Sequence, residues 1–331
     1  MKKLLTSVVA AVACYAGVAS AAEINPAVIY DMGGRFDRSF NQGAYNGAEK
    51  YKEDNGTEYR DFEIQNDSQR EQAMRNFARR GMNPIVAIGF NQASALEKVA
   101  KEFPETKFTI IDMVVDLPNV QSVVFKEHEG SFLVGVLAAM ASKTGKVGFI
   151  GGMDIPLISK FSCGYAQGVK YANSDAEIFQ NMTGTTPSAW NDPVKGGELA
   201  KSQFDRGADV VYHAAGGTGV GVLQAAADAG KLGIGVDSNQ NGMHPGSVLT
   251  SMLKRVDVAV YEAFASAAGD NWQPGLTVLG LAEGGVDWAL DENNEKLISE
   301  DMKAAVAKAK EEIISGSLEV HDYTSDSACP M

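Results

Sequence analysis

Residues 27–42 read AVIYDMGGRFDRSFNQ and contain the pattern on which the rest of the chain is built. The first four residues are an apolar run with β-branched and aromatic side chains, which predicts a buried strand. The glycines and aspartates that follow are typical of a turn. Ser39 belongs to a residue type that favours helix N-caps, so we expect it to cap a helix that starts there.

The same succession of strand, turn and amphipathic helix recurs along the chain and predicts βαβ units with parallel sheets. In the first half we expect strands at residues 27–30, 58–64, 84–88, 107–111 and 120–125, and helices at 39–55, 68–80 and 91–103. In the second half we expect strands at 146–150, 176–180, 210–213 and 233–236, and helices at 130–142, 158–173, 193–206 and 219–229. The pattern therefore predicts two α/β lobes of similar size.

The last part of the chain predicts returns between the lobes. Residues 247–253 form a strand-like run, 254–268 a helix, 276–290 a further crossing and 299–315 a C-terminal helix. We interpret these segments as part of a three-strand hinge between interleaved lobes, because no Ser/Pro-rich linker separates two halves. One lobe is expected to comprise residues 22–126 and 250–276, and the other residues 127–249 and 277–331.

Composition sets further limits. The chain has 331 residues, 45% of them apolar, which predicts a globular protein of about two domains. Its formal net charge of −13 argues against DNA or RNA as a partner, because nucleic-acid binding depends on basic surfaces.

Residues 1–21 predict a cleaved secretory signal peptide. They contain two lysines, a short apolar stretch and the A-x-A sequence Ala19-Ser20-Ala21. Cleavage would change the net charge from −13 to −15 and leave a periplasmic protein. Cys14 leaves lipid anchoring as an alternative, although Ala11-Val12-Ala13 lacks the Leu that is usual before a lipidated cysteine.

Two cysteines follow the signal peptide, Cys163 and Cys329. In an oxidising compartment they could pair, or one could be buried and the other lie near the C-terminus. Neither has metal-ligand spacing, and we expect no metal site and no cofactor.

Enzyme signatures are absent from the sequence. It contains no H-E-x-x-H, C-x-x-C, G-x-S-x-G or Walker A motif, and none of its four histidines lies beside an obvious nucleophile. We therefore expect a binding protein and not an enzyme.

The turn after the first strand offers groups that could bind a ligand, because open α/β sheets bind ligands at the carboxyl ends of their strands. Phe40 could stack on a flat ring or contact the core. Asn41 carries both a donor and an acceptor, which suits the edge of a base.

Each lobe also places one aspartate at the end of a strand, Asp112 in the first and Asp237 in the second. A carboxylate can accept hydrogen bonds from vicinal hydroxyls, each contributing about 1.5–3 kcal/mol, although aspartate also favours turns. Lys254 is expected to start a helix, where a cation is unfavourable, so we interpret it as a ligand contact. The glycines of residues 216–221, GGTGVG, could let a neutral hydroxylated ligand touch the backbone, or form only a tight turn.

Four spaced motifs, DRSFNQ at residues 37–42, KVGFIGGM at 146–153, AGGTG at 215–219 and GVDS at 235–238, resemble the basic membrane protein family. The likeness extends over residues 26–315. Its members are bacterial substrate-binding proteins of ABC transporters, and those that have been characterised bind purine nucleosides. The resemblance implies the type I periplasmic-binding-protein fold, with two Rossmann-like lobes and three crossovers.

The resemblance also implies roles for the candidate residues. Phe40 is similar to the aromatic that stacks on the base, and Asn41 and Asp112 to the base-edge contacts. Asp237 and Lys254 are similar to the pair that holds the ribose, with Gly216 and Gly217 alongside. The second stacking aromatic could be His213 or Trp190. The implied partners are an adenosine-, inosine- or guanosine-like ligand and an ABC permease in the inner membrane, and we expect a monomer.

Two other readings stay open from the sequence. The ligand could be a sugar or another small polar molecule, and the receptor could serve sensing and not transport. Alternatively, the chain could be a nucleoside hydrolase that uses Asp31, Asp37 and Asp112 as a calcium-dependent carboxylate cluster.

Overall fold

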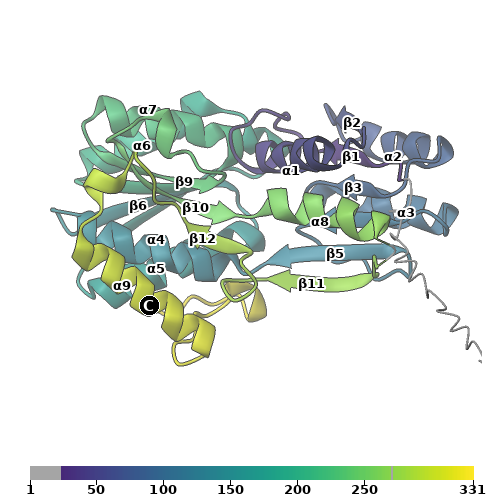
Figure 1. Cartoon of the computed structure of the whole chain (residues 1–331). Helices are drawn as coiled ribbons and strands as arrows, with labels where there is room; N and C mark the ends of the chain where they lie inside the picture. Colours follow the sequence, from purple (N-terminus) through teal and green to yellow (C-terminus); the bar gives the residue numbers. More distant parts are fainter. Residues whose placement is uncertain (1–23, 270) are drawn as a thin grey trace, which may run out of the picture.

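The computed structural model describes residues 24–269 and 271–331 and shows a mixed α/β fold of two lobes that lie side by side, each built on a six-stranded sheet (Figure 1). This arrangement confirms the predicted fold class. The predicted signal peptide and Cys14 lie outside the described residues. Within them, no helix is both long and apolar enough to cross a bilayer.

The sheet of the first lobe has the order β11-β5-β4-β3-β1-β2, with every neighbouring pair parallel. Its strands are β1 (Ala27–Tyr30), β2 (Arg60–Glu63), β3 (Ile85–Ala87), β4 (Phe108–Ile111), β5 (Val120–Phe125) and β11 (Gly275–Leu279). Its helices are α1 (Phe40–Asn55), α2 (Gln69–Arg79), α3 (Ala93–Glu102) and α8 (Val256–Ala268). Tyr51 of α1 packs edge-on against Tyr261 and Phe264 of α8, which fixes α8 to this lobe.

Burial explains why the central strands are short apolar runs. Every residue of β1, β3 and β4 is buried, as expected for parallel strands covered by helices on both faces. The edge strand β2 instead alternates exposed and half-buried side chains.

The sheet of the second lobe has the order β12-β10-β9-β8-β6-β7, parallel except for β12, which runs antiparallel to β10. Its strands are β6 (Lys146–Met153), β7 (Glu177–Gly184), β8 (Val210–Ala214), β9 (Leu232–Asp237), β10 (Val248–Lys254) and β12 (Val286–Trp288). Its helices are α4 (Glu127–Ala141), α5 (Pro156–Ala172), α6 (Pro193–Asp205), α7 (Gly219–Asp228) and α9 (Glu300–Ser315). Helices α4 and α5 are packed so closely that a Cβ on Gly168 would lie 2.0 Å from the carbonyl oxygen of Phe132.

The chain crosses between the lobes three times, between β5 and α4, between β10 and α8, and between β11 and β12 (Figure 1). Because β10 pairs within the second sheet and β11 within the first, the last two crossings follow Lys254 and Leu279. The sequence prediction placed them at residues 249/250 and 276/277, a few residues too early. The strand-like run 247–253 gave no sign of which sheet it joins.

The two lobes touch each other in this structure. The Ser39 hydroxyl of the first lobe donates to the Asp237 carboxylate of the second. The Ser238 hydroxyl donates to the Ser39 carbonyl oxygen at 2.8 Å, and the Gln240 side chain donates to the Arg38 carbonyl oxygen at 3.0 Å. The lobes are therefore closed on each other.

Cys163 of α5 and Cys329 near the C-terminus form a disulfide, with their Cα atoms 5.6 Å apart. The sequence had left pairing open. The bond holds the chain that follows α9 against the second lobe.

Candidate ligand-binding cleft

A cavity lies where the carboxyl ends of the parallel strands of both lobes face each other, as is usual for ligand sites in open α/β folds. The first lobe contributes side chains from the segments that follow β1, β3 and β4. The second lobe contributes the start of α5, the segments after β7 and β8, and the ends of β9 and β10. The lining residues are Asp31, Met32, Asp37, Phe40, Asn41, Gly89, Phe90, Asp112, Leu157, Ile158, Phe161, Trp190, Ala214, Gly216, Val236, Asp237 and Lys254.

Asp112 and Asp237 occupy equivalent places in the two lobes. Each directly follows or ends a strand, and each has a left-handed backbone conformation, with φ of 69° and 63°. Few residue types other than glycine tolerate this region, and aspartate is one of them. Such conformations are concentrated at functional sites, so the backbone supports the choice of these two residues from the sequence.

Lys254 is the last residue of β10, so the prediction that it starts a helix is wrong. Its ammonium group donates to Asp112 Oδ2 at 2.6 Å and lies 2.9 Å from Glu127 Oε1. The residue is only 3% exposed. A strand end at the crossing thus delivers one buried cation to the cavity.

The carboxylates around Lys254 titrate differently from exposed ones. Burial raises the pKa of Asp112 to about 6, opposed by Lys254 and reinforced by Glu127. Burial also raises the pKa of Asp237 to about 6, opposed by Lys254 and Ser39. For Lys254, burial favours the neutral amine, but the surrounding carboxylates raise its pKa above the ordinary value, so it stays charged.

One oxygen of Asp112 is left over. Oδ2 pairs with Lys254, whereas Oδ1 is buried and has no hydrogen-bond partner among the described residues. An unsatisfied buried acceptor costs free energy, so this oxygen is suited to accept a hydrogen bond from a ligand.

Aromatic side chains reach the cavity from both lobes. Phe40 begins α1 of the first lobe, and its ring centroid lies 5.1 Å from Lys254 Nζ. Trp190 ends the short helix Pro187–Trp190 of the second lobe. Its ring rests on Gly152, where a Cβ would lie 2.0 Å from the indole. Gly152, the last glycine of the KVGFIGGM motif, therefore makes room for Trp190.

His213 does not line the cavity. Its ring is fully buried, Nε2 is 3.0 Å from Gln240 Oε1, and a Cβ on Gly219 would strike the ring. Burial lowers the pKa of His213 to about 4, so it is neutral. Of the two aromatics left open by the sequence, the structure brings only Trp190 to the cavity. Gly217 is likewise absent from the cavity lining, whereas Gly216 is part of it.

Hydrogen bonds to the side chain of Asp37 stabilise the loop before α1. The Asp37 carboxylate accepts from the backbone N–H groups of Ser39, Asn41 and Gln42 at 2.8–3.0 Å. Ser39 stands at the N-cap position, but its hydroxyl makes no capping bond and bonds Asp237 instead. The predicted capping role of Ser39 is therefore wrong, and Asp37 performs it.

Asn41 lines the cavity with an amide that is already engaged. Its Oδ1 accepts from the Asp31 N–H at 3.1 Å, and its Nδ2 donates to Asp37 Oδ2 at 3.2 Å. A base-edge contact by Asn41 would have to share these groups.

The three aspartates of the hydrolase reading each have other partners. Asp31 pairs with Arg70 at 2.6 Å, Asp37 caps α1, and Asp112 pairs with Lys254. Among the described residues, no three His, Cys, Asp or Glu side chains are grouped so as to hold a metal ion.

Sequence reasoning missed the apolar wall of the cavity. Leu157, Ile158 and Phe161 lie at the start of α5, Met32 lies in the turn after β1, and Phe90 begins the short helix Phe90–Gln92 that follows β3. The available signal was the position of α5, which begins just after the strand that carries the KVGFIGGM motif.

Comparison with known proteins places this geometry in context. The profile of the family described as "ABC transporter substrate-binding protein PnrA-like" (Bmp) matches residues 24–323. The chain is 35% identical to "ABC transporter nucleoside-binding protein BmpA" of Lactococcus lactis subsp. cremoris, over 90% of this chain and 89% of that one. It is also 35% identical to an "Uncharacterized lipoprotein" of Pyrococcus furiosus, over 84% of this chain and 73% of that one.

Among solved structures, a solute-binding protein of an ABC transporter system from Aeropyrum pernix K1 superposes with a TM-score of 0.83. It is 32% identical to the chain, and the alignment covers 90% of this chain and 93% of that one.

Proposed function

The chain belongs to the family of PnrA-like ABC transporter substrate-binding proteins, and from this premise we propose that its interlobe cavity binds a purine nucleoside. Family membership confirms the resemblance seen in the motifs, and proteins of this kind bind a solute and are not enzymes. Which solute this protein binds has to be inferred from the residues that line the cavity.

The observation that carries the proposal is the presence of Phe40 and Trp190 on the same cavity from opposite lobes. Stacking of a base on an aromatic side chain contributes about 1–3 kcal/mol, and every base has two faces. A flat ring between the lobes would use both side chains only when the lobes are closed. The Lactococcus relative is named as nucleoside-binding, which agrees with this choice.

The polar groups suit the rest of a nucleoside. Asp237 and Lys254 together offer an acceptor and a donor for ribose hydroxyls, and hydrogen bonds to charged groups contribute about 1.5–3 kcal/mol. The free Oδ1 of Asp112 can accept from an N–H group at the base edge. Asn41 adds a second base-edge contact if its amide shares its present bonds.

Opening of the lobes is part of the proposed mechanism. The cavity holds about 70 Å³ in the closed arrangement, whereas ligand pockets hold about 300–1,000 Å³. A nucleoside therefore enters when the lobes rotate apart about the three crossings, and the lobes then close around it less tightly than in the arrangement described above. An ABC permease in the inner membrane then recognises the closed, monomeric receptor.

Thermal unfolding in the presence of candidate ligands tests the proposal. Adenosine, inosine, guanosine, uridine and ribose are added separately, and at least one purine nucleoside should stabilise the protein by about 2.7 kcal/mol at a hundredfold excess over its Kd. Stabilisation by ribose without any purine nucleoside would favour a sugar receptor. No stabilisation by any purine nucleoside would refute the assignment, and release of free base during long incubation would favour a hydrolase.

The proposed location is the periplasm, after cleavage following Ala21, although the Pyrococcus relative is named a lipoprotein. The mass of the mature protein from bacterial envelopes decides between the two forms. An N-terminus at Ala22 supports the free form, whereas an acylated N-terminus at Cys14 supports the anchored one.

A further inference from the structure

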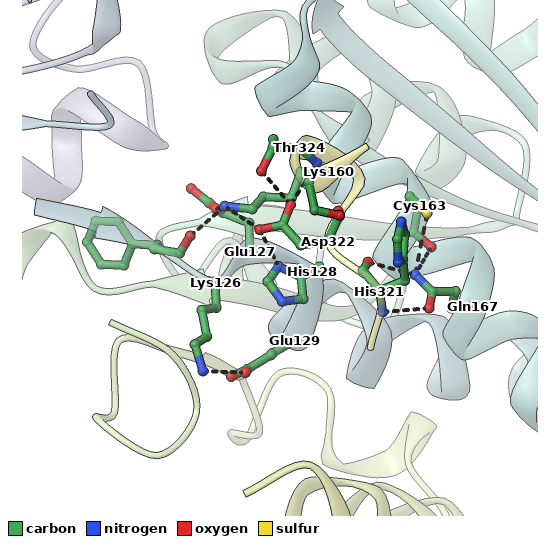
Figure 2. A network of polar contacts seen from close by, with 12 residues as sticks. Lys126, Glu127, His128, Glu129, Lys160, Cys163, Gln167, His321, Asp322 and Thr324 are labelled. Carbon is green, nitrogen blue, oxygen red and sulfur yellow. Dashed lines mark hydrogen bonds and ion pairs between the residues drawn. The ribbon is translucent and has the colours of Figure 1, made fainter. Parts of the chain in front are cut away.

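The chain after α9 forms a strap, residues 317–331, that runs over α5. Val320 is its one buried residue, at 7% exposed, and the other strap residues are half-buried or exposed. Two attachments hold the strap to α5. One is the disulfide between Cys329 and Cys163, and the other is a pair of hydrogen bonds between the Gln167 amide and the backbone of His321, at 2.9 and 3.0 Å (Figure 2).

Asp322 of the strap points toward the first crossing between the lobes (Figure 2). Its Oδ1 accepts from the backbone and hydroxyl of Thr324 at 2.8 and 2.7 Å, which orients the carboxylate. Its Oδ2 lies 3.5 Å from Lys160 Nζ and 3.8 Å from His128 Nδ1. The strap thus supplies a negative charge to two buried groups of the second lobe.

Lys160 carries this contact toward the ligand cavity. Its ammonium group donates to Glu127 Oε2 at 3.0 Å and to the Phe125 carbonyl oxygen at 2.9 Å (Figure 2). The other oxygen of Glu127 lies 2.9 Å from Lys254 Nζ, and Lys254 pairs with Asp112. Charges of alternating sign therefore run without a break from the strap to the cavity wall.

Glu127 is the shared member of this series. Its side chain is 1% exposed, and both lysines hold its pKa below the ordinary value against the effect of burial. A carboxylate shared between two cations moves toward the one whose charge is less well balanced. Asp322 balances Lys160, so it leaves Glu127 available to Lys254.

The strap is not packed onto the crossing. A cavity of about 930 Å³ lies between them, lined by Phe125, Lys126, His128, Glu319, Asp322 and other residues of the crossings and the strap. Besides the buried Val320, the disulfide and the Gln167 bonds hold Asp322 at its distance from Lys160.

We propose that Asp322 is a positioning residue for the ligand site, held in place by the disulfide-tethered strap and acting through Lys160 and Glu127 on Lys254. Without Asp322, Glu127 turns toward Lys160, and Lys254 pairs more completely with Asp112 at the expense of the ligand. The test with a nucleoside rests on the proposed function.

Calorimetric titration with inosine, or with whichever purine nucleoside binds best, tests the proposal. D322N should weaken binding about threefold to tenfold, the range expected for coupling through a charged network. D322E should restore affinity to within about twofold of the wild type, which a purely structural role of the strap would not explain. D326N is the matched control, because Asp326 lies in the same strap but pairs with His321 at the surface.

Two further variants test whether the effect of Asp322 on binding passes through Lys160 and depends on the strap. In a K160M background, D322N should cause no additional loss, because the connection to Glu127 is already broken. C163S/C329S should weaken binding in the same direction as D322N but by less, because the Gln167 bonds and Val320 still hold the strap. Affinity of D322N within twofold of the wild type, or an unchanged D322N effect in K160M, would overturn the proposal.

Failure of the proposed function gives a different result, namely a wild-type protein that binds no purine nucleoside. The coupling is then measured from melting temperatures of D322N, D112N and the double variant, since Asp322 and Asp112 do not touch. Non-additive shifts in melting temperature would support coupling between Asp322 and Asp112 through the alternating charges, whereas additive shifts would overturn the proposal.

Discussion

Asp112 and Asp237 lie at the carboxyl ends of equivalent strands in the two lobes, yet each is held by a different kind of partner. Both carboxylates are buried, and both have left-handed backbones. Asp112 reaches across the cleft to an ammonium group, that of Lys254, beside the crossings. Asp237 reaches across it in the opposite direction to a neutral hydroxyl, that of Ser39.

This difference predicts different behaviour for the two contacts between the lobes, the Asp112–Lys254 ion pair and the Ser39–Asp237 hydrogen bond, which we call the two bridges. A buried ion pair is costly to break, because each charge would be left without a partner. A hydroxyl-to-carboxylate bond can be exchanged for a ligand hydroxyl at little net cost. We therefore expect the Asp112–Lys254 pair to persist during lobe movement and the Ser39–Asp237 bond to be exchanged for ligand contacts.

Replacing Lys254 by Met should have the largest effect of the variants that test these two bridges, and the effect should be on stability. The apolar side chain leaves Asp112 and Glu127 buried without their shared cation, so the free energy of unfolding should fall by about 3–5 kcal/mol, measured by urea denaturation. K308M is the control, because Lys308 is exposed and weakly paired, and it should change stability by less than about 0.5 kcal/mol. A K254M loss no larger than that of K308M would mean that the ion pair is not a structural bridge.

The D237N variant tests the Ser39–Asp237 bridge. It should change the affinity for the ligand more than the stability of the fold. Loss of the charge should weaken nucleoside binding by about 1.5–3 kcal/mol, measured by calorimetry. Stability should hold or rise, because burial disfavours the ionised form of Asp237. D116N, at an exposed first-lobe aspartate, should leave both quantities unchanged. Loss of stability without loss of affinity in D237N would reverse the roles assigned to the two bridges.

Acidification should weaken ligand binding. The pKa values of Asp112 and Asp237 are raised to about 6, so lowering the pH from 7.5 to 5 protonates both and weakens binding by about tenfold per group that contacts the ligand.

The same titration affects folding with the opposite sign. A carboxyl whose pKa is higher in the folded than in the unfolded state adds stability as the pH falls from about 6 to about 4. Calorimetry and denaturation at both pH values separate the two effects. Affinity that is flat between pH 7.5 and 5 would show that neither carboxylate binds in its ionised form.

The S39A variant should have the smallest effect, and its sign is informative. Without the hydroxyl, a ligand no longer has to displace Ser39 from Asp237, so binding should tighten by about 0.5–1.5 kcal/mol in calorimetry. S238A is the matched control, since it removes an interlobe bond that does not involve Asp237. Weaker binding by S39A would mean that Ser39 stays bonded to Asp237 in the complex.

The parallel-sheet strands could be predicted from the sequence because their apolar runs reflect burial on both faces. β1 and β5 have the predicted bounds, and α6 and α7 differ from them by one residue at their C-terminal ends. Sheet membership of β10 could not be predicted, since period-2 patterns do not say which neighbour a strand pairs with. The start of α4 was also missed, because Glu127, His128 and Glu129 look like a solvated turn but are buried.

The site was predictable where position in the βαβ pattern determines it. Asp112, Asp237 and Gly216 reach the cavity because they lie at or just after strand ends, and Phe40 reaches it because it begins the helix that follows β1. The choice between His213 and Trp190 was not predictable, because it depends on the side chain that packs over Gly152. The partners of Lys254 were hidden too, because they come from residues that are more than a hundred positions away in the sequence.

Fluorescence of Trp190 tests the central claim most directly. In a W272F/W288F background Trp190 is the remaining tryptophan, and it lines the cavity. Titration with adenosine, inosine or guanosine should produce a saturable change in its emission for at least one of them, whereas ribose should produce none. Emission that no purine nucleoside alters, in a protein that still folds, would contradict the binding of a base between Phe40 and Trp190.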